Sequence, residues 1–540
     1  MSLQIKYVDA PVGAQTEAVF SADSTQPFGT TENLQLGSTD TPWATLEPGC
    51  WALDGSRVLF PNDPKQIGWW STQRSEDDGR FAQPPVISIS FPQPYTATGI
   101  TFWFWPSLGH WCSEIQVSWY NGETLLAETT QYPDEAEWVL SKAVEAFDRI
   151  DIQLLATNVP GQFAKIRQIQ IGHVVLFLQD EIVKVSLLNE VDPSLCQLSV
   201  DTMTVEIRDR KNRPLIPQMN QSMQLFRNGQ QIASHYITDS NRQTQQYYTF
   251  RCQSAIGQLE DDYLGGVYSG ETVKNLLDGI LDGFSYKLDE QFAEDTLTGY
   301  LPVCTRREAL QQIAFAIGAV VTTQGDGTIR LSPLPEETEA AFTDGDIFTG
   351  AKVSREAQTA TVQIFAHSYT RSNEEETLLN GEQVSGESVL FFFSEPHYDY
   401  YSPDDSCVIT DSGANWVQIT GGEGVTLTAK KYKHSTSVYA KKNPLATAAE
   451  KGNVVTVENA TLIHAGNVEM ALSRLYDFYM QKNVLTQQVI VTGQKAGQIA
   501  RSTNPWGSIT EGYITSMESA YTHTGHTADI TIRGKEVQSE

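Results

Sequence analysis

The sequence predicts a mainly β protein with a small α/β insert, and three observations lead to this fold class. Most of the 540 residues form short runs of alternating apolar and polar side chains that end at turn-forming residues, with 39 Gly and 23 Pro spread along the chain. Only three segments have the periodicity of a helix. The length also exceeds what one hydrophobic core supports, so several domains are expected.

Residues 1–175 are expected to form a β-sandwich. Evenly spaced strands without an intervening helix are typical of sandwiches. Asn121-Gly122 supplies a hairpin turn between the third strand and an apolar run at 124–126. The predicted strands cover residues 86–91, 100–105, 115–120, 150–154 and 166–171.

Residues 176–261 are expected to form a first small β-barrel. Met203, Val205 and Ile207 alternate with polar residues, as in a strand that is buried on one face. Asn228-Gly229 lies between two apolar runs and predicts a type I′ turn, because both central residues of that turn have positive φ. A further strand is predicted at 247–252.

Residues 262–335 are expected to form an α/β subdomain that begins with a helix. Val273, Leu276, Leu277, Ile280 and Leu281 recur at the spacing of one helical face. They therefore predict a short helix with one buried side.

A second helix of this subdomain is predicted from its two ends. Thr305 and Glu308 have the spacing of a capping box, and Gly318 can end the helix in the left-handed conformation. Residues 319–323 and 328–331 are then expected to pair as a hairpin.

Strands return in residues 336–460, which are expected to form a second β-barrel. They are predicted at 360–366, 389–393, 416–420 and 425–429, and the glycines between the last two predict a hairpin. Residues 461–540 complete this part of the fold with a helix at 467–482 and closing strands at 488–492, 511–516 and 528–533.

The chain carries 37 Lys and Arg against 66 Asp and Glu, a formal net charge of −29. This excess argues against a protein that grips DNA, which needs a basic surface, although many soluble bacterial proteins are acidic. Residues 1–10 have no secretory signal pattern, and no apolar run approaches the roughly 18 residues that span a bilayer. The six cysteines lie far apart, so we interpret them as buried thiols made in a reducing compartment.

Three stretches resemble the tail hub family of phages and related injection machines, which includes the base of the type VI secretion spike. The second of them is the most specific and is similar to hub proteins of prophages in Gram-positive bacteria. The resemblance that they carry extends over residues 176–540, and the motifs are structural. The stretches are 183–192 with 202–209, then 270–277 with 301–318, and finally 471–479 with 492–497 and 511–516.

The N-terminal region resembles the discoidin-like, galactose-binding jelly roll. The similarity covers about 100 residues and rests on Asp54-Gly55, Trp70-Ser71, and the strands at 86–91 and 98–102. It implies a fold and leaves the ligand open.

The hub resemblance implies a homotrimer in which two similar barrels per chain form a ring of six. Such a ring adapts a sixfold tail tube to a threefold spike or receptor-binding fibre. Its neighbours would be a distal-tail or tube-end protein and the tape-measure protein. Three chains carry 3 × (−29) = −87 charges, so an acidic bore would let DNA pass without specific binding. The protein is then expected in the virion, at the tail tip, after assembly in the bacterial cytoplasm.

An aromatic cluster in the N-terminal region is a candidate saccharide site. Exposed tryptophan faces stack on sugar rings, and Arg or His side chains hydrogen-bond hydroxyls, so a host wall polysaccharide is a possible ligand. The alternative is that the alternating aromatic residues fill the sandwich core or an interface. The candidate residues are Trp69, Trp70, Arg74, Trp103, Trp105, His110 and Trp111.

Other charged clusters are interpreted as solvated surface. The acidic runs 76–78, 260–262 and 374–376 do not follow a calcium-loop spacing. Lysines at 430, 431, 433, 441 and 442 either face solvent or pair with an acidic neighbouring subunit.

Catalytic signatures are absent from the sequence, and no cofactor or metal site is predicted. The expectation is a structural protein that is not an enzyme, with any lysin or spike supplied separately because the chain stops soon after Arg533. The alternatives are a carbohydrate-binding adhesin that acts through the jelly roll and, second, a cell-wall hydrolase.

Overall fold

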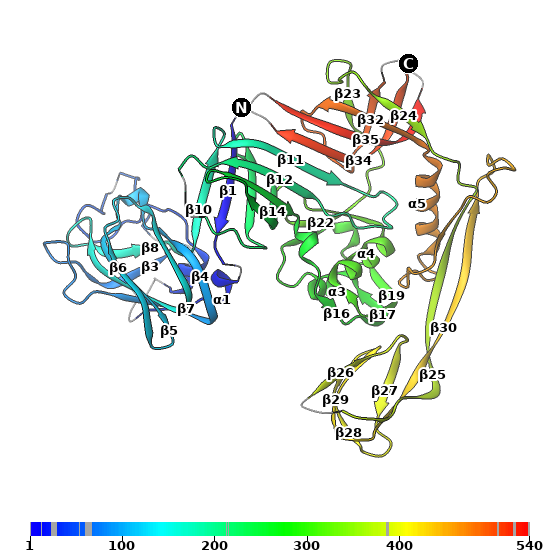
Figure 1. Cartoon of the computed structure of the whole chain (residues 1–540), viewed down its shortest axis with the longest axis horizontal. Coiled ribbons are helices and arrows are strands. Elements are labelled where there is room, and N and C mark those ends of the chain that lie inside the picture. Colours follow the sequence, from blue (N-terminus) through cyan, green and yellow to red (C-terminus); the bar gives the residue numbers. More distant parts are fainter. Residues whose placement is uncertain are drawn as a thin grey trace.

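The computed structural model describes residues 2–11, 13–22, 30–52, 54–59, 67–211, 213, 215–384, 388–504, 507–521 and 525–537. Within these residues it has 35 strands and five α-helices, so the mainly β fold class is confirmed. Figure 1 shows a jelly roll, a central body and a long arm, each occupying its own region.

The jelly roll has one main sheet of six strands and a small sheet of two strands. The main sheet runs β2-β4-β7-β5-β6, with β9 also pairing β4, and the small sheet pairs β3 with β8. The run predicted at 166–171 is therefore two strands, because the chain changes sheets at Arg167. The elements are α1 (Ala14–Glu17), β2 (Val19–Ala22), α2 (Glu32–Leu36), β3 (Trp69–Arg74), β4 (Val86–Trp103), β5 (Cys112–Asn121), β6 (Thr124–Gln131), β7 (Glu137–Thr157), β8 (Phe163–Ile166) and β9 (Gln168–Ile171).

The central body is built on one sheet of 13 strands. Its first half is ordered β10-β1-β13-β14-β15-β12-β11. Met203, Val205 and Ile207 of β12 are buried, and Asn228 and Gly229 have φ values of 51° and 80°, as their sequence pattern predicts. The strands are β1 (Leu3–Asp9), β10 (His173–Leu178), β11 (Ile182–Glu190), β12 (Thr202–Arg208), β13 (Ser222–Arg227), β14 (Gln230–Arg242) and β15 (Tyr247–Gln253).

The N-terminal strand differs from expectation. β1 pairs β13 and β10, so it belongs to the large sheet, and the jelly roll is inserted between β1 and β10. The expected boundary at 175 falls inside β10 and would separate β1 from β13, a strand with which β1 pairs. Alternation of Leu3, Ile5 and Tyr7 shows that β1 is buried on one face, but this pattern does not specify which sheet receives it.

A cluster of buried polar groups fixes the jelly roll to the large sheet. The carboxylate of Asp9 accepts hydrogen bonds from Thr98 in β4 (3.0 Å), from Tyr7 (3.0 Å) and from Gln221 (3.3 Å). Burial raises the pKa of Asp9. The jelly roll thus has a defined orientation at this junction.

The second half of the large sheet continues from the first without a break. β11 pairs β34 from Val185↔Tyr521 to Glu190↔Ser516, and the order continues β34-β35-β32-β24, with β33 bridging β34 and β23. The strands are β23 (Thr338–Phe342), β24 (Lys352–Arg355), β32 (Asn483–Ile490), β33 (Ile499–Thr503), β34 (Ile509–Tyr521) and β35 (His526–Val537).

The α/β subdomain covers one side of this body. Thr305 forms the capping box with Glu308, and Gly318 ends the second helix with φ 82°, as expected. The residues predicted to pair as a hairpin do so, since β21 runs antiparallel to β22. The elements are β16 (Asp262–Tyr263), β17 (Gly266–Thr272), α3 (Val273–Ile280), β18 (Tyr286–Leu288), β19 (Thr296–Leu301), β20 (Cys304–Thr305), α4 (Arg306–Ile317), β21 (Ala319–Thr322) and β22 (Ile329–Pro333).

Residues 361–442 form an arm, where the sequence predicts part of a second barrel. β25 and β30 make a long antiparallel ribbon that leaves the body beside α5 and ends in a small domain at the lower right of Figure 1. That domain has its own core, which includes Val417, Ile419 and Leu427. The elements of the arm are β25 (Thr361–Glu382), β26 (Val389–Phe392), β27 (His397–Tyr401), β28 (Cys407–Ser412), β29 (Trp416–Gly421) and β30 (Val425–Lys442). After the arm, β31 (Val454–Val457) and α5 (Val468–Met480) follow in the chain.

The expected hairpin between 416–420 and 425–429 is wrong. β29 pairs β26 and β28, whereas β30 pairs β25 and β27. The intervening glycines let the chain cross from one small sheet to the other, so the two strands pack face to face in the arm-tip core. Glycine-rich turns serve both kinds of connection, and the sequence does not distinguish them.

Candidate functional site

The predicted aromatic cluster gathers at one end of the jelly roll. β3 carries Trp69 and Trp70, and Trp105 follows β4 and bridges to His110. The rings of Trp70 and Trp105 meet edge to face, with centroids 5.9 Å apart. The guanidinium of Arg74 lies 5.0 Å from the centroid of the Phe163 ring. The structure therefore brings most of these side chains into one region.

Burial divides the seven candidate residues into two groups. Trp69 and Trp105 are 0% exposed, and Trp70 and His110 are each 7% exposed. These four side chains fill the interior and present no stacking face in this structure. Trp103 and Trp111 are half-buried, and Arg74 is exposed, so only these three can meet a ligand directly.

Next to the buried aromatic rings lies a fully buried ion pair between Lys165 and Glu47. The ammonium of Lys165 in β8 lies 2.6 Å from Glu47 Oε1, and both side chains are 0% exposed. Lys165 Nζ also lies 3.1 Å from His110 Nδ1 and 3.2 Å from Gln162 Oε1, and it lies 5.0 Å from the ring of Trp70. Its three N–H groups therefore all have partners, which a buried charge requires.

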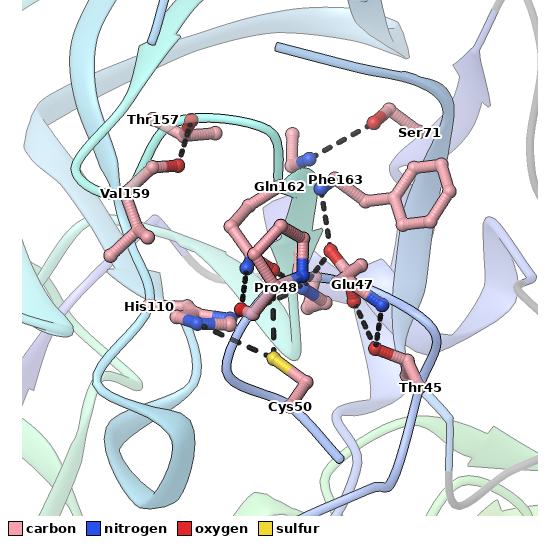
Figure 2. A network of polar contacts seen from close by, with 12 residues as sticks. Thr45, Glu47, Pro48, Cys50, Ser71, His110, Thr157, Val159, Gln162 and Phe163 are labelled. Atoms are coloured by element: carbon pink, nitrogen blue, oxygen red, sulfur yellow. Dashed lines mark hydrogen bonds and ion pairs between the residues drawn. The ribbon is translucent and has the colours of Figure 1, made fainter. Parts of the chain in front are cut away.

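The carboxylate of Glu47 is equally well satisfied. Oε1 accepts the amide N–H of Phe163 at 2.7 Å, and Oε2 accepts the hydroxyl of Thr45 at 2.6 Å. Gln162 extends the network, since its Nε2 donates to the carbonyl of Pro48 at 2.6 Å (Figure 2). The network attaches the loop around residues 45–50 to the end of β8.

The proton positions in this network follow from its chemistry. An ammonium has no acceptor, so Lys165 donates to His110 Nδ1, and the ring proton of neutral His110 is on Nε2, which faces Cys50 Sγ at 3.7 Å. Burial, followed by the charge of Lys165, lowers the pKa of His110 to about 3. Burial also lowers the pKa of Lys165, against the opposing effect of Glu47. The imidazole is therefore neutral at ordinary pH.

This buried network positions an exposed ring that the sequence does not single out. Trp51 follows Cys50 directly and is 54% exposed. Glu47 and Lys165 were also missed, because they lie 118 residues apart and no local motif relates them.

The other polar clusters are accounted for by local contacts. Glu260 pairs with Arg307 at 2.6 Å, and Glu376 pairs with Lys431 at 3.1 Å and His397 at 3.0 Å. Among the described residues, no group of three His, Cys, Asp or Glu side chains has an arrangement that can hold a metal ion. In the same residues, no helix has the length and apolar character needed to cross a bilayer.

A second candidate surface is formed by the two ends of the large sheet. Among the strands that the structure describes, β10 and β24 end the main order of this sheet and each pairs on one side, while β23 ends the branch through β33. Leu176 and Leu178 of β10 are 46% and 43% exposed. Exposed strand edges and apolar side chains are the features by which chains associate.

No protein-family model matches this sequence, and no curated protein matches it. Solved structures do. A tail protein from Neisseria meningitidis MC58 aligns over 67% of this chain and 93% of its own, with 12% identity and a TM-score of 0.41. A component of the E. coli type VI secretion system, described as similar to bacteriophage T4 tail proteins, aligns over 66% of this chain and 74% of its own, with 7% identity and a TM-score of 0.32.

A third solved structure matches the N-terminal part. The family 32 carbohydrate-binding module of C. perfringens NanJ, solved with galactose, aligns over 32% of this chain and 99% of its own, with 18% identity and a TM-score of 0.19. Tail proteins and galactose-binding modules, the two groups that the sequence resembles, are thus both present among the similar structures.

Proposed function

We propose that this protein is the structural hub at the tip of a phage or phage-like tail, and that three copies assemble into a ring. The observation that carries the proposal is the continuous large sheet, in which β11–β34 pairing joins two halves into one surface with open edges at β10 and β24. Such edges are normally covered or paired, and neighbouring copies of the same chain can cover them.

The proposed ring adapts a sixfold tail tube to a threefold spike or receptor-binding fibre. Each chain contributes two sheet halves, so three chains would present six sheet halves around an axis. A distal-tail or tube-end protein and the tape-measure protein are the proposed neighbours, and the ring would assemble in the bacterial cytoplasm before joining the virion.

The net charge of −29 per chain supports a passive role toward DNA. A bore lined by carboxylates repels the phosphate backbone, so DNA or the tape measure would pass without specific binding. In this proposal the protein acts by assembly and has no catalytic step.

The oligomeric state tests the proposal. Light scattering after size exclusion should give about 180 kDa, three times the chain mass of 59.9 kDa, and negative-stain images should show a threefold ring with a central hole. A single-chain mass at tens of micromolar, or particles without a hole, would contradict it.

Two leucine-to-lysine variants make this test specific. L176K/L178K adds charge to the exposed face of the β10 edge and should yield a folded single chain. L126K, at a residue of similar exposure (41%) in the jelly roll, is the matched control and should remain trimeric. Equal assembly of both variants would show that the β10 edge is not an interface.

A second candidate function, saccharide binding by the jelly roll, is favoured by one observation. The exposed ring of Trp51 is held beside the buried network, and Arg74, Trp103 and Trp111 remain partly accessible at the same end. Rigid aromatic faces with nearby polar donors suit sugar rings. This function is compatible with a hub whose jelly roll faces outward.

Binding of the full chain to host wall polysaccharide tests this second candidate. W51A should weaken binding without unfolding the chain, because the ring is already exposed. W69A and W70A should destabilise the jelly roll instead, since they remove buried rings. Undiminished binding by W51A together with R74A would remove the sugar proposal.

A further inference from the structure

A cavity of about 450 Å³ lies where the two halves of the large sheet meet. Strand β11, the β13–β14 turn, the β21–β22 turn, the loop before β33 and the ends of β34 and β35 surround it. Its lining residues are Leu187, Asn189, Arg227, Asn228, Gln230, Gln231, Ile232, Gln324, Gly325, Val491, Thr492, Gly493, Gln494, Lys495, Met517, Ser519, Tyr521 and His526.

The charge of this lining is opposite to that of the chain. The protein has 66 Asp and Glu among 540 residues, yet none of the described residues that line the cavity is acidic. Arg227 and Lys495 are its charged groups, and amides and hydroxyls supply most of the rest. A metal ion or a basic peptide would find no carboxylate here.

Arg227 and His526 both belong to the lining and contact each other. Arg227 Nη1 lies 2.9 Å from His526 Nδ1. A guanidinium only donates, so His526 Nδ1 must accept, and the ring proton is on Nε2. His526 also stacks on Tyr521 with ring centroids 4.2 Å apart, which fixes the plane of the imidazole.

Two hydrogen-bond donors in this pair have no partner. Arg227 Nε and His526 Nε2 are both buried and unbonded, and the His526 side chain is 8% exposed. Buried donors are nearly always satisfied, so an unmet pair beside a cavity indicates an acceptor that comes from outside the chain.

We propose that this cavity is a binding site for an oxyanion, of the carboxylate or phosphate type. A guanidinium matches the geometry of both groups, and the exposed ammonium of Lys495 adds a second positive charge at the mouth. Because the rest of this acidic chain repels anions, a free anion would concentrate where carboxylates are missing. The site is independent of the hub proposal and stands in a single chain.

Calorimetric titration of the full chain with inorganic phosphate and, separately, with glutarate tests the site. Saturable binding of either anion is expected. Binding of both would point to an acidic side chain as the natural ligand, and binding of phosphate alone would point to a phosphoryl group. If neither anion binds at concentrations up to about 10 mM, the proposal is overturned, because a specific site should have a dissociation constant below that value.

The variant R227Q should weaken binding about tenfold or more, because it removes the charged donor. The matched control R251Q lies in the same sheet, where Arg251 is exposed and pairs with Asp239 at 3.2 Å, and it should bind as the unmodified chain does. Should R227Q fail to fold, K495Q replaces an exposed residue and should still weaken binding severalfold. Unchanged affinity in K495Q and in folded R227Q would overturn the site.

Discussion

The ammonium of Lys165 and the carboxylate of Glu47 lie 2.6 Å apart with neither side chain exposed, and they attach the loop around residues 45–50 to strand β8. A pair in this position is stable only because every remaining donor and acceptor is bonded. The hydroxyl of Thr45, the amide of Phe163 and the side chain of Gln162 supply those bonds. The free energy of unfolding of the jelly roll should therefore depend strongly on the presence of both Lys165 and Glu47.

Replacing only the lysine tests this dependence. K165M leaves Glu47 as a buried charge without a partner, and we expect the free energy of unfolding of the jelly roll to fall by about 3–5 kcal/mol. Urea unfolding followed by tryptophan fluorescence measures it, since several buried tryptophans surround the pair. The jelly-roll transition should move to lower urea while later transitions stay in place.

The exposed pair of Arg251 and Asp239 is the control for this change. R251M should lower the free energy of unfolding by less than about 1 kcal/mol, because solvent already screens both charges. The double variant E47L/K165M should recover much of the loss, since it removes both buried charges. If K165M and R251M shifted the transitions equally, the pair would have no special role.

Three buried histidines predict a loss of stability in acid. Burial lowers the pKa of His110 to about 3 and the pKa values of His235 and His526 to about 4. The folded state therefore binds fewer protons than the unfolded state below the ordinary histidine pKa of about 6.5. Their stabilising effect is complete above pH 6.5 and declines by about 1.4 kcal/mol per histidine for each pH unit below it.

Two carboxylates, Asp9 and Asp201, act in the opposite direction, because burial raises the pKa of each. Burial raises the pKa of Asp201 to about 6, so its contribution grows as the pH falls from 6 toward 3.8 and offsets the loss from one histidine. A net decline in the free energy of unfolding between pH 6.5 and pH 4.5 is still expected, and urea titrations at several pH values measure it.

The variant H235F isolates one of these groups. His235 is 2% exposed and neither ring nitrogen has a partner, so phenylalanine removes the titration without breaking a hydrogen bond. H235F should flatten the pH dependence by about 1.4 kcal/mol per pH unit. An identical slope in H235F and the unmodified chain would show that His235 does not remain neutral in the folded state.

The end of helix α4 gives a matched pair of glycine variants. Gly318 has φ 82° and its added Cβ would lie 2.8 Å from Arg474 Nη1, while Gly270 has the same φ and open space around it. G270A should cost about 1–2 kcal/mol from backbone strain alone. G318A should cost more, because Arg474 must also move, and its guanidinium holds the carbonyl of Phe315 at 2.7 Å. Thermal unfolding of the two variants measures the difference, and equal losses would mean that Arg474 adapts freely.

Local sequence patterns correctly predicted the elements that are determined by residues close together in the chain. The capping box of Thr305 and Glu308, the end of α4 at Gly318 and the turn at Asn228-Gly229 all appear as expected, because each depends on residues within a few positions of one another. The length of the arm ribbon was not predicted, since residues 368–378 of β25 and 430–442 of β30 include no buried side chain and lack the alternation that burial imposes.

Long-range pairing explains why the site was predicted only in part. The aromatic residues were recognised as a cluster, but their burial depends on the loop that Glu47 and Lys165 hold across 118 residues. The carboxylate-free cavity is also formed by five separate segments of the chain, and no local motif marks it. The composition predicts that the net charge of the whole chain is negative. The charge of one cavity depends instead on which segments of the chain line it.

The arm provides the last prediction, because its tip has a core of its own. The buried residues of that core belong to residues 379–427 and form a cluster separate from the core of the central body. Arg371 and Tyr432 face each other across the ribbon, so replacing residues 372–431 with Asn-Gly should close the ribbon with a tight turn. The shortened chain should keep the melting temperature of the central body.

A variant with two substitutions distinguishes the effect of unfolding the arm tip from the effect of removing the ribbon. V417D/I419D places two charges in the arm-tip core and should unfold the tip in the full-length chain, while the body melts as before. Differential scanning calorimetry can detect the loss of a separate tip transition in both variants. If the central body melted at a lower temperature in both variants, the arm tip and the body would form one cooperative unit. The ribbon would then transmit stability along its length, and the tip would not be an independent domain.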